Sequence, residues 1–115
     1  MGYRSDVAIA LASEAIALLK EKLEATKDAD KRYLFDNPDH HATDNDTGDE
    51  LFRWNQVKWY DGYPEVDFVS RFLRELDSSS YLFVRVGEQY DDIELCGDYW
   101  TNAFGLDVAT SIVTA

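Results

Sequence analysis

The first quarter of the chain changes from a two-residue hydrophobic period to a helical one. Between Arg4 and Leu11, apolar residues alternate with small or polar ones, which predicts a strand. Ser13 then has the character of an N-cap, and an acidic residue follows it in the first turn. The helix is expected to end near Lys27 and to bury three residues at helical spacing, Ile16, Leu19 and Leu23.

The middle of the chain combines weaker signals with one strong strand. Lys31–Phe35 is expected to be a short second strand, which the following Asn-Pro pair ends. The polar stretch that continues to Asp49 is expected to be a loop. Leu51–Tyr60 alternates again and predicts a strand. Its adjacent aromatic residues, Trp59 and Tyr60, are expected to point to opposite faces.

A second helix and a hairpin are expected after this strand. Pro64 suits the first position of a helix. Tyr81–Val86 and Asp92–Cys96 are expected to pair around a turn at Gly87–Asp91, and Val108–Val113 to form a last strand. Ser78–Ser80 is expected to connect the helix to the hairpin. The helix that begins at Pro64 is expected to bury a stripe formed by Val66, Val69, Phe72 or Leu73, and Leu76.

These elements predict one α+β domain that spans residues 1–115. Their order is β-α-β-β-α-β-β, with the last strand as an eighth element. Two helices packed on one face of a mostly antiparallel sheet bury the apolar faces of both layers. The expected arrangement is therefore related to the split β-α-β, or ferredoxin-like, fold.

Two segments account for the whole net charge of the chain. The sequence has 23 acidic and 11 basic residues, which gives a formal net charge of −12. The acidic loop at residues 36–50 and the segment from Gly87 onward contain six carboxylates each and neither Lys nor Arg. Such a charge repels nucleic acid and membranes and attracts basic partners. High solubility explains the same charge equally well.

Targeting and membrane segments are not expected. The apolar run Val7–Leu19 is interrupted by Ser13 and Glu14, so it predicts neither a signal peptide nor a membrane span. Asp6 stands where a myristoylation motif needs Ser or Thr. The single cysteine, Cys96, excludes an internal disulfide and favours a reducing compartment such as the cytoplasm.

The chemistry for catalysis is sparse, so we expect a protein that is not an enzyme, without catalytic residues or a cofactor. A nucleophile needs a positioned base, but no motif links the histidines to Cys96, which is expected to be a small buried residue. Adjacent histidines in an extended chain point apart, and the calcium-like run at residues 44–49 has its glycine one position early. The weak metal candidates are His40, His41, Asp44 and Asp46.

Aromatic residues are the remaining candidates for binding. Some of these aromatic residues must form the core, and core packing alone is also a sufficient explanation for all of them. Exposed aromatic side chains beside acidic residues are good anchors in protein interfaces. The set comprises Trp54, Trp59, Tyr60, Tyr63, Tyr99 and Trp100.

Three stretches of the chain resemble a group of small proteins encoded by tailed phages and prophages. They are MGYRSDV at residues 1–7, VKWYDGYPEV at 57–66, and FVRVGE at 83–88 with the DDIE that follows at 91–94. The resemblance covers the first seven residues and most of residues 51–94. Because the group has no established activity, the resemblance implies a phage accessory protein in the bacterial cytoplasm but implies no mechanism.

The leading hypothesis is a phage-encoded, acidic inhibitor that binds a basic host or defence protein and binds neither nucleic acid nor membrane directly. Carboxylates on one face of a strand repeat every ~6.6–6.8 Å, so nucleic-acid mimicry is part of the hypothesis if both acidic segments share one face. The alternatives are a self-assembling, homo-oligomeric phage component that associates through an edge such as Val108–Val113, and, ranked last, a metal-dependent enzyme. The expected partner-binding residues are Asp44, Asp46, Asp49, Glu50, Glu88, Asp91, Asp92, Glu94, Trp59 and Tyr60.

Overall fold

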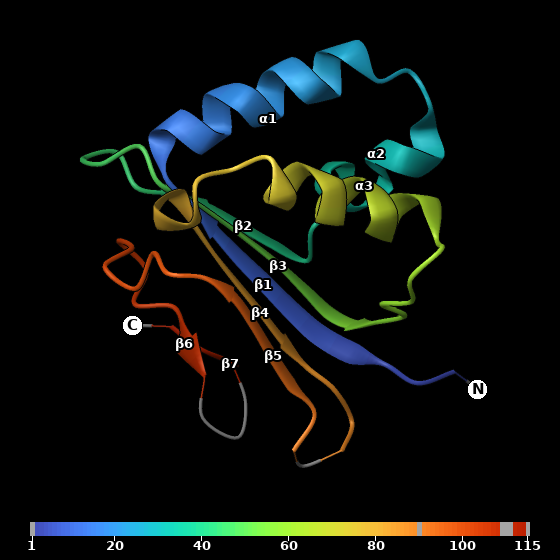
Figure 1. Cartoon of the computed structure of the whole chain (residues 1–115). Helices are drawn as coiled ribbons and strands as arrows, with labels where there is room; N and C mark the ends of the chain where they lie inside the picture. Colours follow the sequence, from blue (N-terminus) through green and yellow to red (C-terminus); the bar gives the residue numbers. More distant parts are fainter. Residues whose placement is uncertain (1, 90, 109–111, 115) are drawn as a thin grey trace.

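A five-stranded antiparallel sheet forms the centre of the computed structural model, which describes residues 2–89, 91–108 and 112–114. The strand order is β2-β3-β1-β4-β5, and every neighbouring pair is antiparallel (Figure 1). The strands are β1 (Ser5–Leu11), β2 (His40–Thr43), β3 (Glu50–Val57), β4 (Tyr81–Val86) and β5 (Ile93–Gly97). Helix α3 connects β3 to β4 with β1 between them, so the predicted split β-α-β arrangement and the α+β class are confirmed.

Three helices cover one face of this sheet, as Figure 1 shows. They are α1 (Ser13–Ala25), α2 (Ala29–Asp36) and α3 (Pro64–Arg74). Beneath them lies the main core, in which residues of β1, β3 and β4 contact the buried stripes of the helices. The stripe predicted for α3 is confirmed for Val66, Val69, Phe72 and Leu73, which are all buried. Its last predicted member, Leu76, instead lies after the end of α3 and is partly buried against the same core.

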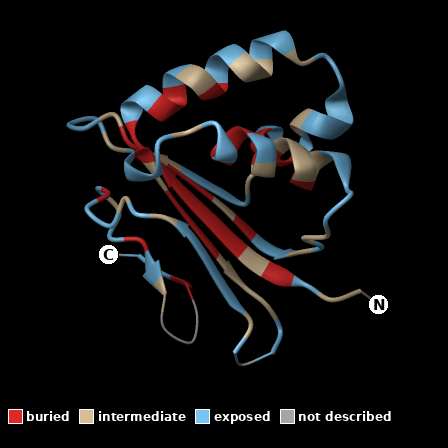
Figure 2. Ribbon diagram, in the orientation of Figure 1, coloured by how far each residue is buried: buried red, intermediate tan, exposed pale blue. Residues whose placement is uncertain are grey.

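The opposite face of the sheet is covered in part by the C-terminal segment. Ala8 and Ala10 of β1 lie on this face in a second buried cluster. Leu106 and Ile112 pack onto it. Figure 2 shows the result, with buried residues along the central strands and exposed residues along β5.

The prediction of a strand at Lys31–Phe35 was wrong, because these residues belong to α2. The Asp28 side chain accepts the Asp30 N–H and caps the helix. Phe35 is buried and makes edge-to-face contact with four aromatic rings. The Leu34 carbonyl accepts the Trp54 indole N–H at 2.8 Å. A helical turn satisfies these contacts together, whereas alternation over five residues carries little information.

The region predicted as a continuous loop up to Asp49 contains the edge strand β2, so that prediction was also wrong. Strand β2 pairs with β3 from His40 opposite Arg53 to Thr43 opposite Glu50. The remaining turn is short, since the Gly48 N–H donates to the Asp44 carbonyl at 2.8 Å. Polar residues therefore form a strand here because β3 offers an unpaired edge.

Two further element predictions need correction. The helix α1 begins at Ser13, and its N-cap is Ala12, which has no side-chain hydrogen bond. The last strand predicted at Val108–Val113 is instead two short antiparallel strands, β6 (Asp107–Val108) and β7 (Ile112–Val113). Residues 109–111 of that prediction lie outside the described part of the chain. Among the described residues, no helix has the length and apolarity to cross a bilayer.

Candidate functional site

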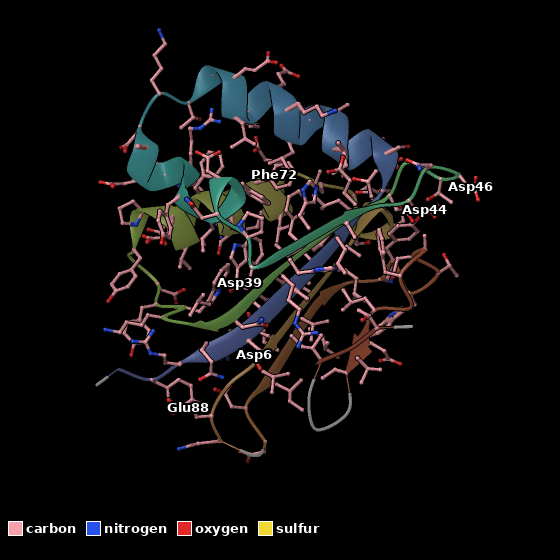
Figure 3. All side chains as sticks on the ribbon, turned by 180° about the vertical axis from the view of Figure 1, so that it is seen from behind. Asp6, Asp39, Asp44, Asp46, Phe72 and Glu88 are labelled. Atoms are coloured by element: carbon pink, nitrogen blue, oxygen red, sulfur yellow. The ribbon has the colours of Figure 1, made fainter. Side chains whose placement is uncertain are left out.

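The two acidic segments lie at opposite edges of the sheet. Residues 36–50 contain the edge strand β2, and residues 88–98 contain the other edge strand, β5. Four strand spacings separate these edges, which corresponds to about 19 Å. Asp44 and Asp46 lie at one corner of the molecule and Glu88 at the diagonally opposite corner (Figure 3). These two strand edges therefore do not merge into one continuous acidic surface, although the later part of the second segment returns to the first, where Tyr99 and Ala103 donate hydrogen bonds to Asp49.

Most carboxylates of the first segment serve the fold. Asp44 accepts the Thr47 N–H and hydroxyl, and these hydrogen bonds lower its pKa. Asp49 is 2% exposed and accepts hydrogen bonds from the Tyr99 hydroxyl and the Ala103 N–H. The prediction of Asp49 as a partner-binding residue was therefore wrong. Glu50 is partly buried and bonds to His41 at 2.6 Å, which leaves Asp46 as the exposed carboxylate of the turn.

In the second segment, Arg85 holds two of the predicted carboxylates. Its guanidinium donates to both oxygens of Asp92, at 3.2 and 2.7 Å, and to Glu94 at 2.9 Å. Tyr3 donates its hydroxyl hydrogen to Asp92 at 2.6 Å. The bonds from Arg85 and Tyr3 lower the pKa of Asp92, and the pairing raises the pKa of Arg85. The Arg85–Asp92 pair is therefore charge-neutral, and Glu94 keeps one carboxylate oxygen without a hydrogen bond to the described residues.

A hollow beside β5 is lined by both acidic and aromatic residues that were predicted to bind a partner. It has a volume of about 630 Å³ and lies between α3 and the β4–β5 part of the sheet, since residues of all three elements line it. We call it the edge hollow. Four of the predicted partner-binding residues line it: Trp59, Tyr60, Asp92 and Glu94. Its other lining residues include Tyr3, Asp61, Arg74, Tyr81, Phe83, Arg85 and Cys96.

Trp59 and Tyr60 both line the edge hollow because β3 ends before them. Strand β3 stops at Val57, after a register shift opposite β1 and a positive φ of 55° at Gln56. Trp59 and Tyr60 then follow a non-strand path and line the same hollow. The expectation that they point to opposite faces of a strand was wrong. Trp54 belongs instead to the core, where it is 1% exposed.

Cys96 lies on the exposed edge strand, so the prediction of a buried cysteine was wrong. Residues on one face of β5 alternate, and Cys96 therefore shares its face with Glu94. Desolvation and the negative charge of Glu94 raise the pKa of the Cys96 thiol. A thiol with a raised pKa is protonated at neutral pH and is a poor nucleophile.

The predicted metal candidates do not converge. His40 is opposite Arg53 and His41 is opposite Phe52, so the two imidazoles project to different faces of β2. His41 also stacks on Phe52 with ring centroids 4.4 Å apart. Among residues 2–89, 91–108 and 112–114, no cluster of three or more His, Cys, Asp or Glu side chains has a metal-binding arrangement.

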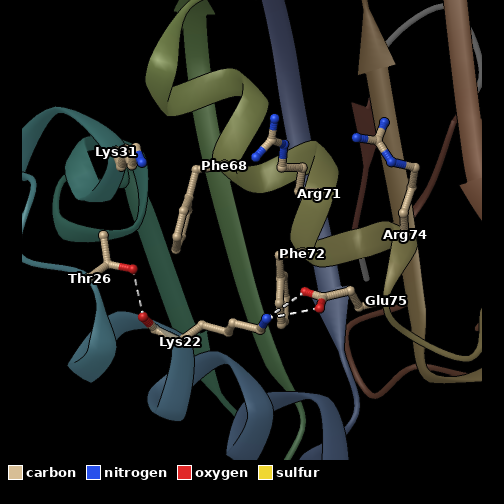
Figure 4. A pocket seen from close by; sticks show the side chains of 8 residues that line it. All are labelled: Lys22, Thr26, Lys31, Phe68, Arg71, Phe72, Arg74 and Glu75. Carbon is tan, nitrogen blue, oxygen red and sulfur yellow. Dashed lines mark hydrogen bonds and ion pairs between the residues drawn. The ribbon is translucent and has the colours of Figure 1, made fainter.

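A second hollow, of about 560 Å³, lies between α1 and α3, and half of its eight lining residues are basic (Figure 4). Sequence analysis had identified no such basic patch. Lys22 pairs with Glu75 at 2.8 Å across this hollow. The other cationic residues there are Lys31, Arg71 and Arg74. The helical side of the molecule is consequently less acidic than the two edges of the sheet.

Sequence reasoning missed Tyr3, Asp61, Arg74 and Arg85 as lining residues of the edge hollow. One signal for Arg85 was present, because it is the only charged residue within the apolar strand Tyr81–Val86 and a tight hairpin places acidic residues opposite it. The other three come from distant segments. No protein-family model, curated protein or solved structure gives a significant match to this chain.

Proposed function

We propose that this chain is a binding protein, not an enzyme, and that it captures a positively charged segment of another protein in the edge hollow. The supporting observation is the convergence of Trp59, Tyr60 and Glu94 on one concave surface. A Lys or Arg side chain over an aromatic face gains about 0.5–2 kcal/mol, depending on its desolvation. A carboxylate beside that face adds a charge-assisted hydrogen bond.

Electrostatics around the edge hollow favours a cationic ligand. The Arg85–Asp92 pair is neutral, and Asp61 and Glu94 outnumber the remaining cation, Arg74. Glu88 and Asp91 lie on the turn next to β5 and are exposed. Clustered negative potential of this kind attracts basic partners and speeds their association. Salt screens the charges and so weakens this attraction.

Together with the resemblance to phage proteins, this site suggests a phage-encoded inhibitor that covers a basic surface of a host or defence protein in the bacterial cytoplasm. The proposal does not include one nucleic-acid-like surface built from both acidic segments, because they flank opposite edges of the sheet. Direct binding to nucleic acid or membrane is likewise not proposed. The alternative function is a self-assembling phage component, in which the chain binds copies of itself.

Titration with a short arginine- and lysine-rich peptide, followed by calorimetry at two salt concentrations, tests the proposal. We expect saturable binding that weakens with salt and that falls about tenfold or more in Asp61→Asn/Glu94→Gln. The matched control is Glu24→Gln/Asp46→Asn, which removes the same charge at exposed positions outside the edge hollow. Equal loss in both variants would show attraction by net charge alone. A concentration-dependent oligomer with no peptide binding would favour self-assembly.

A further inference from the structure

In the part of the chain that the structure describes, no strand pairs with the outer edge of β5, which lies next to the edge hollow. Strand β5 is the last strand of the sheet on its side. The Gly87 N–H donates to the Asp92 carbonyl at 2.8 Å, and Glu94 and Cys96 follow opposite Arg85 and Phe83. Because backbone groups alternate in direction along an antiparallel pair, the N–H and C=O groups of Leu95 point away from β4.

The two faces of β5 differ in chemistry. Glu94 and Cys96 face the edge hollow. Ile93 and Leu95 lie on the other face, opposite Val86 and Val84 of β4. They are 38% and 44% exposed, which is unusual for large apolar side chains on a sheet edge. A strand that added to β5 would place alternate side chains on these two faces.

Charge distinguishes which kind of strand fits this edge. Acidic residues flank and interrupt β5, and the segment from Gly87 onward contains no Lys or Arg. If two copies paired edge to edge through β5, the acidic residues of both strands would be brought together, and like charges on paired strands are destabilising. An edge strand with such charges disfavours self-association. A basic strand has the complementary charge and gains from the same residues.

We propose that the partner binds by adding an extended strand to the outer edge of β5. The strand that fits has alternating residues, with Lys or Arg on the side of Glu94 and apolar residues against Ile93 and Leu95. Main-chain hydrogen bonds then supply affinity, and the two faces supply specificity. This inference rests on the proposed function, since the basic side chains of the added strand would occupy the edge hollow.

Peptide backbone chemistry separates this inference from the proposed function. The probe is a short peptide in which Lys alternates with Val and Thr. Two further versions carry N-methyl groups at alternate residues, one version for each edge of the extended peptide. Strand addition uses only one peptide edge, so one version should lose about tenfold or more in affinity while the other retains binding. The side-chain charges are identical in all three peptides.

Amide hydrogen exchange of the protein gives the second readout. Binding of the unmodified peptide should slow exchange of the Leu95 amide, whereas amides on the inner strand β1 should change little, because they already pair on both sides. Strand addition is supported by slowed exchange together with the one-sided effect of N-methylation. Peptide binding that shows neither slowed exchange nor a one-sided effect of N-methylation would overturn strand addition and leave the proposed function standing. Absence of any peptide binding would overturn both.

Discussion

The phenolic hydroxyl of Tyr99 lies 2.8 Å from both carboxylate oxygens of Asp49, although 50 positions separate the two residues in the chain. This contact joins the turn between β2 and β3 to the segment that follows β5. Asp49 also accepts the Ala103 N–H at 3.0 Å. The carboxylate therefore fixes the C-terminal segment over the sheet, and its burial is compensated by two donors, the Tyr99 hydroxyl and the Ala103 N–H.

Replacing Tyr99 by Phe should destabilise the fold by about 1.5–3 kcal/mol, because a buried carboxylate loses a charge-assisted donor. Desolvation and the bond to Asp49 raise the pKa of Tyr99 to about 12. Since the folded pKa exceeds the usual value of 10.0, this stabilisation is complete below pH ~10 and is lost as pH rises toward 12. Denaturant unfolding of both proteins at several alkaline pH values measures the difference, which should shrink as pH increases. A difference that stays constant with pH would contradict this role for Tyr99.

The Arg85–Asp92 pair should make the β4–β5 edge sensitive to acid. Because hydrogen bonds from Arg85 and Tyr3 lower the pKa of Asp92 below 3.8, its stabilising contribution is complete above that value and is lost as pH falls through the lowered pKa. Asp92→Asn should therefore lower the melting temperature near neutral pH and converge with the wild type as the pH falls through the lowered pKa of Asp92. Asp91→Asn, at an exposed neighbour, is the matched control and should have little effect at either pH. Equal shifts for both variants would argue against a specific pair.

Gly97 should tolerate substitution far less well than Gly62. Both have positive φ, 83° and 93° respectively. An added Cβ at Gly97 would lie 2.2 Å from the Tyr81 carbonyl oxygen, whereas one at Gly62 meets nothing within 4 Å. Gly62→Ala should cost only the backbone penalty of about 1–2 kcal/mol. Gly97→Ala should cost clearly more, since the end of β5 must move away from β4, and chemical denaturation of the two variants tests this order.

Added divalent metal should leave the protein unchanged. His40 and His41 project to opposite faces of β2, and His41 is already bonded to Glu50. We therefore expect no shift in melting temperature on addition of zinc or calcium, and the same melting temperature after dialysis against a chelator. His40→Ala, at the histidine that does not bond to Glu50, should behave like the wild type in both conditions. A stoichiometric, saturable shift that His40→Ala removes would contradict this geometry.

The sequence by itself determined the elements whose hydrophobic period is long or clear. Strand β1, helix α3 and the β4–β5 hairpin follow from alternation, from a helical stripe and from a tight turn. These patterns also determined the α+β class, because such faces have few ways to pack together. The total charge and its division between two segments are likewise properties of the sequence alone.

Only the tertiary structure decided the elements and sites that depend on distant partners. Helix α2 forms because Leu34 and Phe35 meet Trp54 and other aromatic residues, which no short window of sequence contains. Strand β2 forms on an edge that β3 provides. The strand order separated the two acidic segments, and the register placed Arg85 against Asp92 and Glu94. Local patterns are set by neighbours along the chain, whereas these contacts are set by which strands lie side by side, so the edge hollow could be recognised only in three dimensions.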